Sequence, residues 1–394
     1  MLLALIVGCA VPPIEPEGSV ELAGVPTGMT LDAGGRPLVV HRDEEGQCCR
    51  LAGFEPTLDT QLFDVGAGPG TPRARPDRTW YALRTGFTAL DPNSADGAEV
   101  LWSTVFDAPV VVDGPAVALS DGTVVLAAND AGDDLLTSGV NARIIALDRF
   151  GALRWEVVFG GVVVGALRAA EDDLVYVVTE PVSGAQQLHA VSPTGTVQWS
   201  NEGGGLPLIP LDDGLLVARA GLLARLDATG EDVWVSAAPV AVTSVDARQE
   251  LTATRTALDQ IWVTAPGQVT SVDLATGSTL LTFDATCGPL VAGTDVALWG
   301  FCETETPGRI ALHSISGFAV QQRGVPVAGQ AVGGPTFTPV EDGVGLATAY
   351  GLFTGPLDAP QPQLVRYPGA TNIDPDAPWG SPYGAGNTGS TTTR

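Results

Sequence analysis

The sequence contains no lysine, and all 19 basic residues among its 394 are arginine. This absence excludes the phosphate-binding loop Gly-x-x-x-x-Gly-Lys and Schiff-base catalysis, which both need a lysine amine. Against the arginines stand 45 acidic residues, which give a formal net charge of −26 at pH 7. An acidic field of this size repels a phosphate backbone, so the sequence predicts no nucleic-acid partner.

Helical periodicity is also lacking. No window places apolar residues at i, i+3, i+4 and i+7 over three turns with capping residues at its ends. The chain instead has 49 glycines and 30 prolines, which form turns, and many valines and threonines, which favour strands. Beyond the N-terminus no stretch approaches 18 unbroken apolar residues, so no membrane-spanning helix is predicted.

Motifs of catalysis are equally scarce. The three histidines, His41, His189 and His313, have no second metal ligand two to four residues away, so each is interpreted as a packed or surface residue. No Gly-x-Ser-x-Gly elbow offers a serine nucleophile. The run Asp91–Gly97 is interpreted as a polar turn, because its glycine comes one place late for an EF-hand and Trp102 stands where the final glutamate would be. We therefore predict no catalytic, cofactor-binding or metal-binding residue.

The N-terminus indicates the compartment. Residues 1–9 read MLLALIVGC, an apolar run followed by a small residue at a cleavage point, although no basic residue precedes the run. Ile6-Val7-Gly8-Cys9 resembles a bacterial lipobox, in which the cysteine after the cut receives a diacylglycerol. This interpretation predicts a signal segment over 1–8, a lipid on Cys9 and an extended spacer over 9–22. Its alternative is a buried first strand with an incidental cysteine.

The residue after the modified cysteine bears on the choice of membrane. In Gram-negative lipoproteins an aspartate there marks retention in the inner membrane, and this chain has Ala10 instead. By that resemblance we expect a lipid-anchored protein of the cell envelope, with the outer membrane favoured and either its periplasmic or its surface face open.

Four further cysteines would lie in an oxidising compartment. Cys287 and Cys302 flank one strand-like run at a separation natural for neighbouring strands, which predicts a disulfide. Cys48 and Cys49 are adjacent, so they form either a strained vicinal disulfide or two free thiols.

One segment type recurs along the chain: an apolar strand, Asp or Ser, a short turn ending in Gly, three residues and then Trp. Each copy has the pattern of a β-hairpin, with glycine where the turn needs a positive φ and the aromatic residue on the returning strand. The clearest copies end at Trp155, Trp199 and Trp234, a looser one ends at Trp102, and the copy around Gly277 has Leu281 where the tryptophan would be.

A second hairpin type alternates with the first, turning near residues 35, 78, 122, 173, 213, 259, 294 and 342. The mean interval is about 44 residues, within the period of propeller blades, and two hairpins per period mean four strands per repeat. The fold class is therefore all-β, a single β-propeller of four-stranded blades. Eight blades are preferred, and the faint first two copies leave seven as the alternative.

The Ala-x-Asp…Gly…Trp pattern, best seen from Ala146 to Trp155, resembles the tryptophan-docking repeat of the quinoprotein alcohol dehydrogenase-like propellers. The resemblance implies that the tryptophans pack between neighbouring blades and do not contact a ligand, namely Trp102, Trp155, Trp199 and Trp234. From the repeats we expect a propeller over 23–370, followed by a small and polar C-terminal tail over 371–394 that is either mobile or closes the ring.

Members of that family that are enzymes hold pyrroloquinoline quinone with Ca²⁺ against an adjacent-cysteine ring, to which Cys48 and Cys49 would correspond. This chain is shorter than such enzymes usually are, and no Ca²⁺ ligand set or catalytic base stands out. We expect a non-catalytic, lipid-anchored binding or scaffold module with no cofactor, which meets the membrane through its lipid and a protein or glycan partner through the propeller loops. The alternative is a quinone-dependent dehydrogenase that uses both pyrroloquinoline quinone and Ca²⁺.

Overall fold

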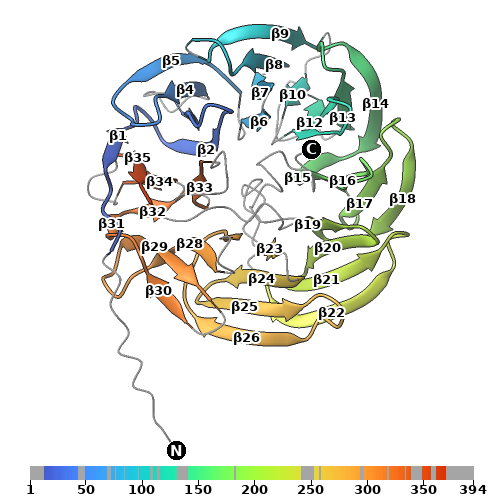
Figure 1. The fold of residues 1–394 in the computed structure, drawn as a ribbon. Coiled ribbons are helices and arrows are strands. Elements are labelled where there is room, and N and C mark those ends of the chain that lie inside the picture. Colours follow the sequence, from blue (N-terminus) through green and yellow to red (C-terminus); the bar gives the residue numbers. More distant parts are fainter. Residues whose placement is uncertain are drawn as a thin grey trace, which may run out of the picture.

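The computed structural model describes most of the chain (Figure 1). The described ranges are 13–42, 49–68, 72–75, 77–83, 85–95, 97–106, 110–112, 116–130, 141–181, 183–240, 253–256, 259–292, 297–316, 319–332, 334–338, 348–355 and 361–369. All regular structure in them is β-strand, and none of these ranges supplies an apolar helix long enough to cross a membrane.

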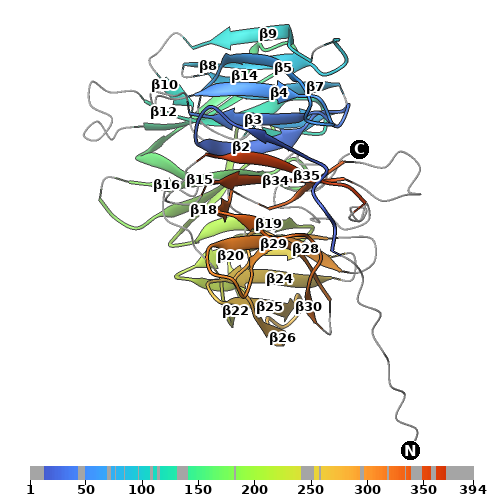
Figure 2. The same cartoon turned by 90° about the vertical axis from the view of Figure 1, so that its left-hand side faces the viewer.

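Eight antiparallel sheets stand around a common axis and form a β-propeller, which Figure 2 shows from the side. Both the all-β fold class and the preferred count of eight blades are confirmed. We number the blades in chain order and their strands from the axis outward.

Blades 1 to 4 contain the following strands: β2 (Pro26–Leu31), β3 (Pro37–His41), β4 (Arg50–Phe54) and β5 (Gln61–Gly66) in blade 1; β6 (Arg73–Arg75), β7 (Arg78–Leu83), β8 (Gly86–Asp91) and β9 (Glu99–Val105) in blade 2; β10 (Val110–Val112), β11 (Val117–Ala118), β12 (Val124–Asp130), β13 (Asn141–Leu147) and β14 (Leu153–Gly160) in blade 3; β15 (Val162–Ala169), β16 (Val175–Glu180), β17 (Gln187–Val191) and β18 (Val197–Glu202) in blade 4.

Blades 5 to 8 contain the remaining strands: β19 (Leu206–Leu211), β20 (Gly214–Arg219), β21 (Leu222–Asp227) and β22 (Asp232–Pro239) in blade 5; β23 (Ala253–Arg255), β24 (Gln260–Ala265), β25 (Gln268–Asp273) and β26 (Thr279–Asp284) in blade 6; β27 (Val291–Ala292), β28 (Leu298–Glu303), β29 (Arg309–Ile315), β30 (Val320–Gln322) and β31 (Val327–Ala328) in blade 7; β32 (Gln330–Ala331), β33 (Thr336–Phe337), β34 (Ala349–Thr354), β35 (Gln363–Tyr367) and β1 (Gly18–Glu21) in blade 8.

The two hairpin types recognised in the sequence have different places in the blade. The second type joins the first strand to the second, as at the turns near residues 35, 122, 173, 213 and 259. The turns near 294 and 342 lie outside the described residues, and the turn near 78 does so in part. The first type joins the third strand to the outermost one, as at Gly151, Gly195, Gly230 and Gly277.

The hydrophobic core is divided among the interfaces between blades. Eight clusters of buried apolar side chains are found, and each draws its members from two adjacent blades. The cluster between blades 8 and 1 includes Tyr350, Leu364, Met29 and Phe54, so the ring is closed by the same kind of contact that holds its other members together. Burial of these faces is the main favourable term in the stability of the fold.

The tryptophans of the outermost strands dock onto the next blade. Each indole Nε1–H donates a hydrogen bond to a carbonyl in the neighbouring hairpin turn: Trp102 to Arg149 (3.0 Å), Trp155 to Pro193 (2.8 Å), Trp199 to Ala228 (2.9 Å) and Trp234 to Leu274 (3.1 Å). The indole rings lie flat against the turn glycines, where an added Cβ would come within 2.6 to 2.9 Å of a ring atom. Those glycines have positive φ as well, so both space and backbone conformation exclude a side chain.

A second hydrogen bond strengthens three of these junctions. The polar side chain two residues after the tryptophan donates to the carbonyl of the docking glycine: Thr104 to Gly151 (2.6 Å), Asn201 to Gly230 (2.5 Å) and Ser236 to Gly277 (2.6 Å). The sequence pattern did not predict this bond, because the position holds three different polar residue types and, in blade 3, Val157.

An arginine performs the docking between blades 1 and 2. The guanidinium of Arg36 lies against Gly97 and donates to the carbonyls of Pro92 and Ser94. Asp32 holds that guanidinium through its Oδ2, 2.6 Å from Nε. The run Asp91–Gly97, interpreted from sequence as a polar turn, is thus the hairpin turn of blade 2 and the acceptor of an arginine.

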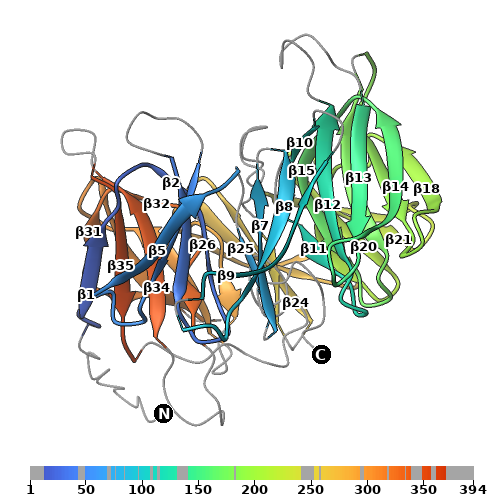
Figure 3. The ribbon, with the colours of Figure 1, turned by 90° about the horizontal axis from the view of Figure 1, so that it is seen from above.

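The ring is closed by the N-terminus. β1 is the outermost strand of blade 8 and pairs antiparallel with β35 from Gly18↔Arg366 to Glu21↔Gln363, as Figure 3 shows at the outer edge of the ring. Residues 18–21, which the sequence analysis placed in the spacer, are therefore part of the propeller. A four-residue strand whose partner lies near the other end of the chain carries no local signal. The predicted tail over 371–394 lies outside the described residues.

We expect Trp199→Ala to lower the free energy of unfolding by about 3 kcal/mol, because it removes an indole contact and a hydrogen bond between two blades. The matched control is Leu281→Ala. Leu281 pairs with Ser271 as Trp199 pairs with Ala190, but it is 37% exposed. Its loss should cost less than about 1 kcal/mol. Equal losses for both variants in urea unfolding would contradict the docking role.

Candidate functional site

The innermost strands carry cations and no carboxylates. None of the first strands that the structure describes contains Asp or Glu. Two arginines are buried there at equivalent positions, Arg73 in blade 2 and Arg168 in blade 4, and each donates from Nε to a carbonyl of the next blade, that of Ala116 or Leu208 (both 3.3 Å). These arginines therefore tie the inner strands of neighbouring blades together.

The same inner strands test the quinone hypothesis. A Ca²⁺ ion takes six to eight oxygen ligands, with carboxylates prominent among them. Within the described residues no group of three or more His, Cys, Asp or Glu side chains could hold a metal ion, and the inner strands offer buried guanidinium groups where a divalent cation would need anions. The described part of the propeller thus does not fit pyrroloquinoline quinone with Ca²⁺.

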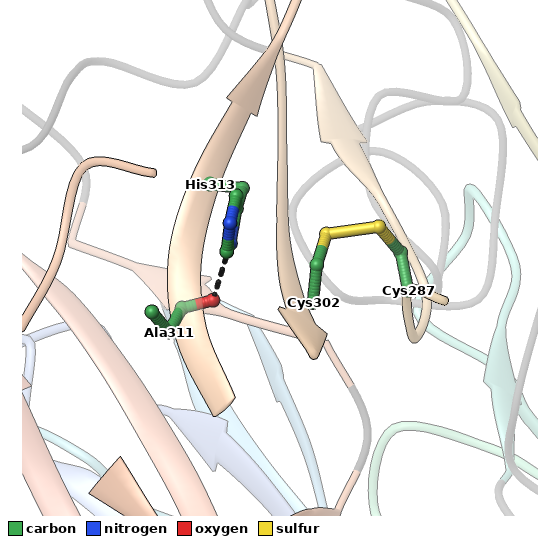
Figure 4. Close-up of a disulfide and its surroundings, with 4 residues drawn as sticks. All are labelled: Cys287, Cys302, Ala311 and His313. Carbon is green, nitrogen blue, oxygen red and sulfur yellow. Dashed lines mark hydrogen bonds between the residues drawn. A yellow bond between two sulfur atoms is a disulfide. The ribbon is translucent and has the colours of Figure 1, made fainter. Parts of the chain in front are cut away.

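The three histidines lie in three different blades and do not meet. His41 is on β3, His189 on β17 and His313 on β29, and all three are buried. The Nδ1 of His41 lies 2.8 Å from the carbonyl of Arg42, and that of His313 lies 2.9 Å from the carbonyl of Ala311 (Figure 4). Each is a packed residue of its own sheet.

His189 has the one arrangement that resembles a catalytic pair. Its Nδ1 lies 2.7 Å from the Oγ of Ser200, its Nε2 lies 2.9 Å from the Oγ1 of Thr179, and its ring stacks on Phe159 of blade 3 at 4.1 Å. A serine beside a histidine is the geometry of an activated nucleophile. The equivalent position in blade 2 holds the pair Thr88 and Ser103, whose hydroxyls lie 3.0 Å apart with no histidine. The contact between His189 and Ser200 is therefore interpreted as a cross-strand hydrogen bond that stabilises the sheet.

Burial controls the protonation of these histidines. Desolvation lowers the pKa of His189 to about 4, and it lowers the pKa of His313 in the same direction. Both imidazoles are neutral at pH 7, so neither supplies a cation to a ligand.

The low pKa of His189 predicts acid sensitivity. His189 binds a proton near pH 6.5 in the unfolded chain and only near pH 4 in the folded chain. Its contribution to the free energy of unfolding is therefore intact above about pH 6.5 and is lost as the pH falls toward 4. Between pH 7 and pH 4 the wild type should lose up to about 3 kcal/mol more stability than His189→Gln. Urea unfolding of both proteins across this range measures the difference, and parallel curves would show that the burial has no such effect.

A disulfide joins Cys287 and Cys302, the pair that the sequence singled out (Figure 4). The bond ties the segment before β27 to β28, and two backbone hydrogen bonds flank it, from Gly288 to Phe301 (3.0 Å) and from Glu303 to Thr286 (2.9 Å). Because β27 has only two residues, this link replaces strand pairing that the first hairpin of blade 7 lacks.

Of the two adjacent cysteines, the structure describes only one. Cys49 is buried and takes part in a disulfide, whereas Cys48 lies outside the described residues. Their pairing with each other stays a prediction, and so does the lipid on Cys9, which also lies outside the described residues.

Exposed apolar side chains gather on the rim of this propeller. Large apolar side chains of the outermost strands of blades 2 to 6 are exposed, with Val105 at 66% and Leu153 at 60%. We call this set the outer apolar arc: Val100, Leu101, Val105, Leu153, Val158, Val197, Val233, Val235, Leu280 and Leu281. Their strands, β9, β14, β18, β22 and β26, follow one another around the ring in Figure 1.

The rest of the rim differs. In the described part of the outermost strands of blades 7, 8 and 1, which are β30, β1 and β5, no large apolar side chain has comparable exposure. Exposed large apolar side chains that gather on neighbouring strands favour an interaction site, whereas single scattered ones do not. The arc is therefore the candidate binding surface. Sequence analysis missed the arc because its valines and leucines lie in the same strands as the docking tryptophans. The repeat accounts for these residues as strand formers and does not show that their side chains are exposed.

Comparisons with known proteins agree with this architecture. Residues 85–210 and 140–283 match the family model described as outer membrane protein assembly factor BamB, and together they span just over half of the chain. The Dos1 propeller is similar in fold, with a TM-score of 0.59, 8% sequence identity, and 91% of this chain and 96% of that one covered.

The C-terminal WD40 domain of Sif2 is similar too, with a TM-score of 0.58, 11% identity, and coverage of 91% and 99%. At these identities the likeness shows the fold alone. No curated protein matches the chain in sequence.

Proposed function

Because the chain belongs to the family described as outer membrane protein assembly factor BamB, we propose that it is a lipid-anchored scaffold of the bacterial cell envelope that binds protein through its rim. The observation that carries the binding role is the outer apolar arc, which lies on fourth strands and none of whose residues belongs to the eight interblade clusters. The proposed role needs no cofactor and no catalytic group.

The chemistry of the arc favours a protein over a glycan. Its side chains are valines and leucines, which bury well against apolar protein surfaces and offer neither hydrogen bonds nor aromatic platforms to a sugar. The formal charge of −26 favours a partner whose surface around the contact is basic, because complementary potentials speed and orient association. A partner at the propeller loops remains a further prediction of the sequence.

The anchor has a direct test. Cys9→Ala removes the thiol that would receive the lipid. The variant should therefore move from the membrane fraction to the soluble fraction of fractionated cells. Val11→Ala is the matched control, since it changes a residue close to Cys9 and keeps the thiol, so it should leave the protein in the membrane fraction. A wild type that is already soluble would disprove the lipid anchor.

The scaffold role is tested by site-specific photo-crosslinking in intact cells. A photoreactive residue at Val158 or Val233 of the arc should give the same protein adduct, because the proposed partner covers the arc on both blades. The control position is Thr306, an exposed residue of blade 7 away from the arc, which should give none. An adduct of equal yield from Thr306, or none from either arc position, would contradict binding through the rim.

A further inference from the structure

Residues 14–22, which follow Cys9 after a short interval, are part of the propeller. We call residues 14–22 the strap. At its start, Ile14 donates from its backbone N–H to the carbonyl of Arg323 (2.5 Å) and accepts from the N–H of Val325 (3.1 Å), which fixes it to blade 7. Its side chain packs on the apolar cluster between blades 7 and 8.

The strap then crosses to blades 8 and 1. Glu17 accepts a charge-assisted hydrogen bond from Arg366 (2.7 Å), and β1 completes blade 8. Gly18 lies so close to blade 1 that an added Cβ would be 2.9 Å from the carbonyl oxygen of Thr57. Leu22 ends the strap, buried in the cluster between blades 8 and 1. Three blades therefore hold the strap in place.

This attachment sets the length of the membrane tether. Five peptide units connect Cys9 to Ile14, and fully extended they span about 17 Å. A domain of about 350 residues has a radius of gyration of about 20 Å and hence a width of about 50 Å. The tether is shorter than half of that width, so the point of attachment cannot turn away from the bilayer.

We infer that the strap orients the propeller on the membrane: blades 7, 8 and 1 face the lipid surface, and the outer apolar arc, centred on blade 4, faces away from it. The inference rests on the proposed lipid at Cys9. It holds because the strap places the anchor beside β30, β1 and β5, the outermost strands whose described residues include no large apolar side chain as exposed as those of the arc. The arc is then free for a partner that approaches from the aqueous side.

The experiment compares two exposed glutamines of outermost strands, Gln321 in blade 7 and Gln198 in blade 4. A fluorescent non-natural residue replaces one or the other in the full chain, which is bound to vesicles whose phospholipid headgroups carry a quencher. We expect the probe at Gln321 to be quenched at least fivefold more than the probe at Gln198. Equal quenching would overturn the orientation.

A variant with a longer spacer tests whether the short tether causes the difference in quenching between the two probes. Twenty Gly and Ser residues inserted between Pro12 and Pro13 lengthen the tether and leave the strap intact, so the difference between the two probes should fall to below twofold. A difference that survives the spacer unchanged would overturn the role of the short tether.

A semisynthetic protein keeps the inference distinct from the proposed function. The same labelled chains carry a synthetic diacylglyceryl cysteine at position 9, attached by peptide ligation. If the natural protein bears no lipid, the proposed anchor fails. The semisynthetic protein still reports the orientation that the strap imposes, and equal quenching of its two probes would overturn the inference itself.

Discussion

The structure depends on one constraint, which is that a four-stranded blade has two apolar faces and can cover neither alone. Each of the eight apolar clusters joins two neighbouring blades, so every blade needs a neighbour on both sides. A linear stack would leave its first and last faces in water. Closure of the ring buries those two faces. It is completed by β1 from the N-terminus, which pairs with β35 and becomes the outermost strand of blade 8.

Two kinds of junction meet this constraint. From blade 2 to blade 6 the junctions repeat, with an indole ring on a turn glycine and an indole N–H on a turn carbonyl. Around blades 7, 8 and 1 the junctions are individual. Tyr350 donates to the carbonyl of Pro56 (2.6 Å), Phe301 packs edge-on against Phe353 at 5.0 Å, and Arg36 takes the place of a tryptophan. The region where the two ends of the ring meet is thus the least regular.

That division explains what could be predicted from the sequence. A turn glycine followed by tryptophan is a local pattern, because the hairpin and the docking surface both lie within a few residues, so the period and the eight blades were recognisable. The contacts of Arg36 join residues more than 50 positions apart, and nothing near Arg36 in the sequence marks them. The two strands β1 and β35 are even farther apart in the sequence, and the residues of β1, GSVE, resemble the spacer before them. The exposure of the arc was also hidden, since alternation of apolar residues predicts a strand without saying which face is covered.

The outer apolar arc is hard to explain by stability. The fourth strands of blades 3 and 5 have eight residues each, against three in blade 7 and four in blade 8, although every blade meets the same packing constraint. The tryptophans of these two strands, Trp155 and Trp234, already dock onto the next blade. Val158, Val233 and Val235 remain about half exposed and add little to any interblade cluster. Threonine at each place would also favour a strand, and its hydroxyl would reduce the risk of association at an open strand edge. An apolar rim that the fold does not need is best explained by a partner that covers it.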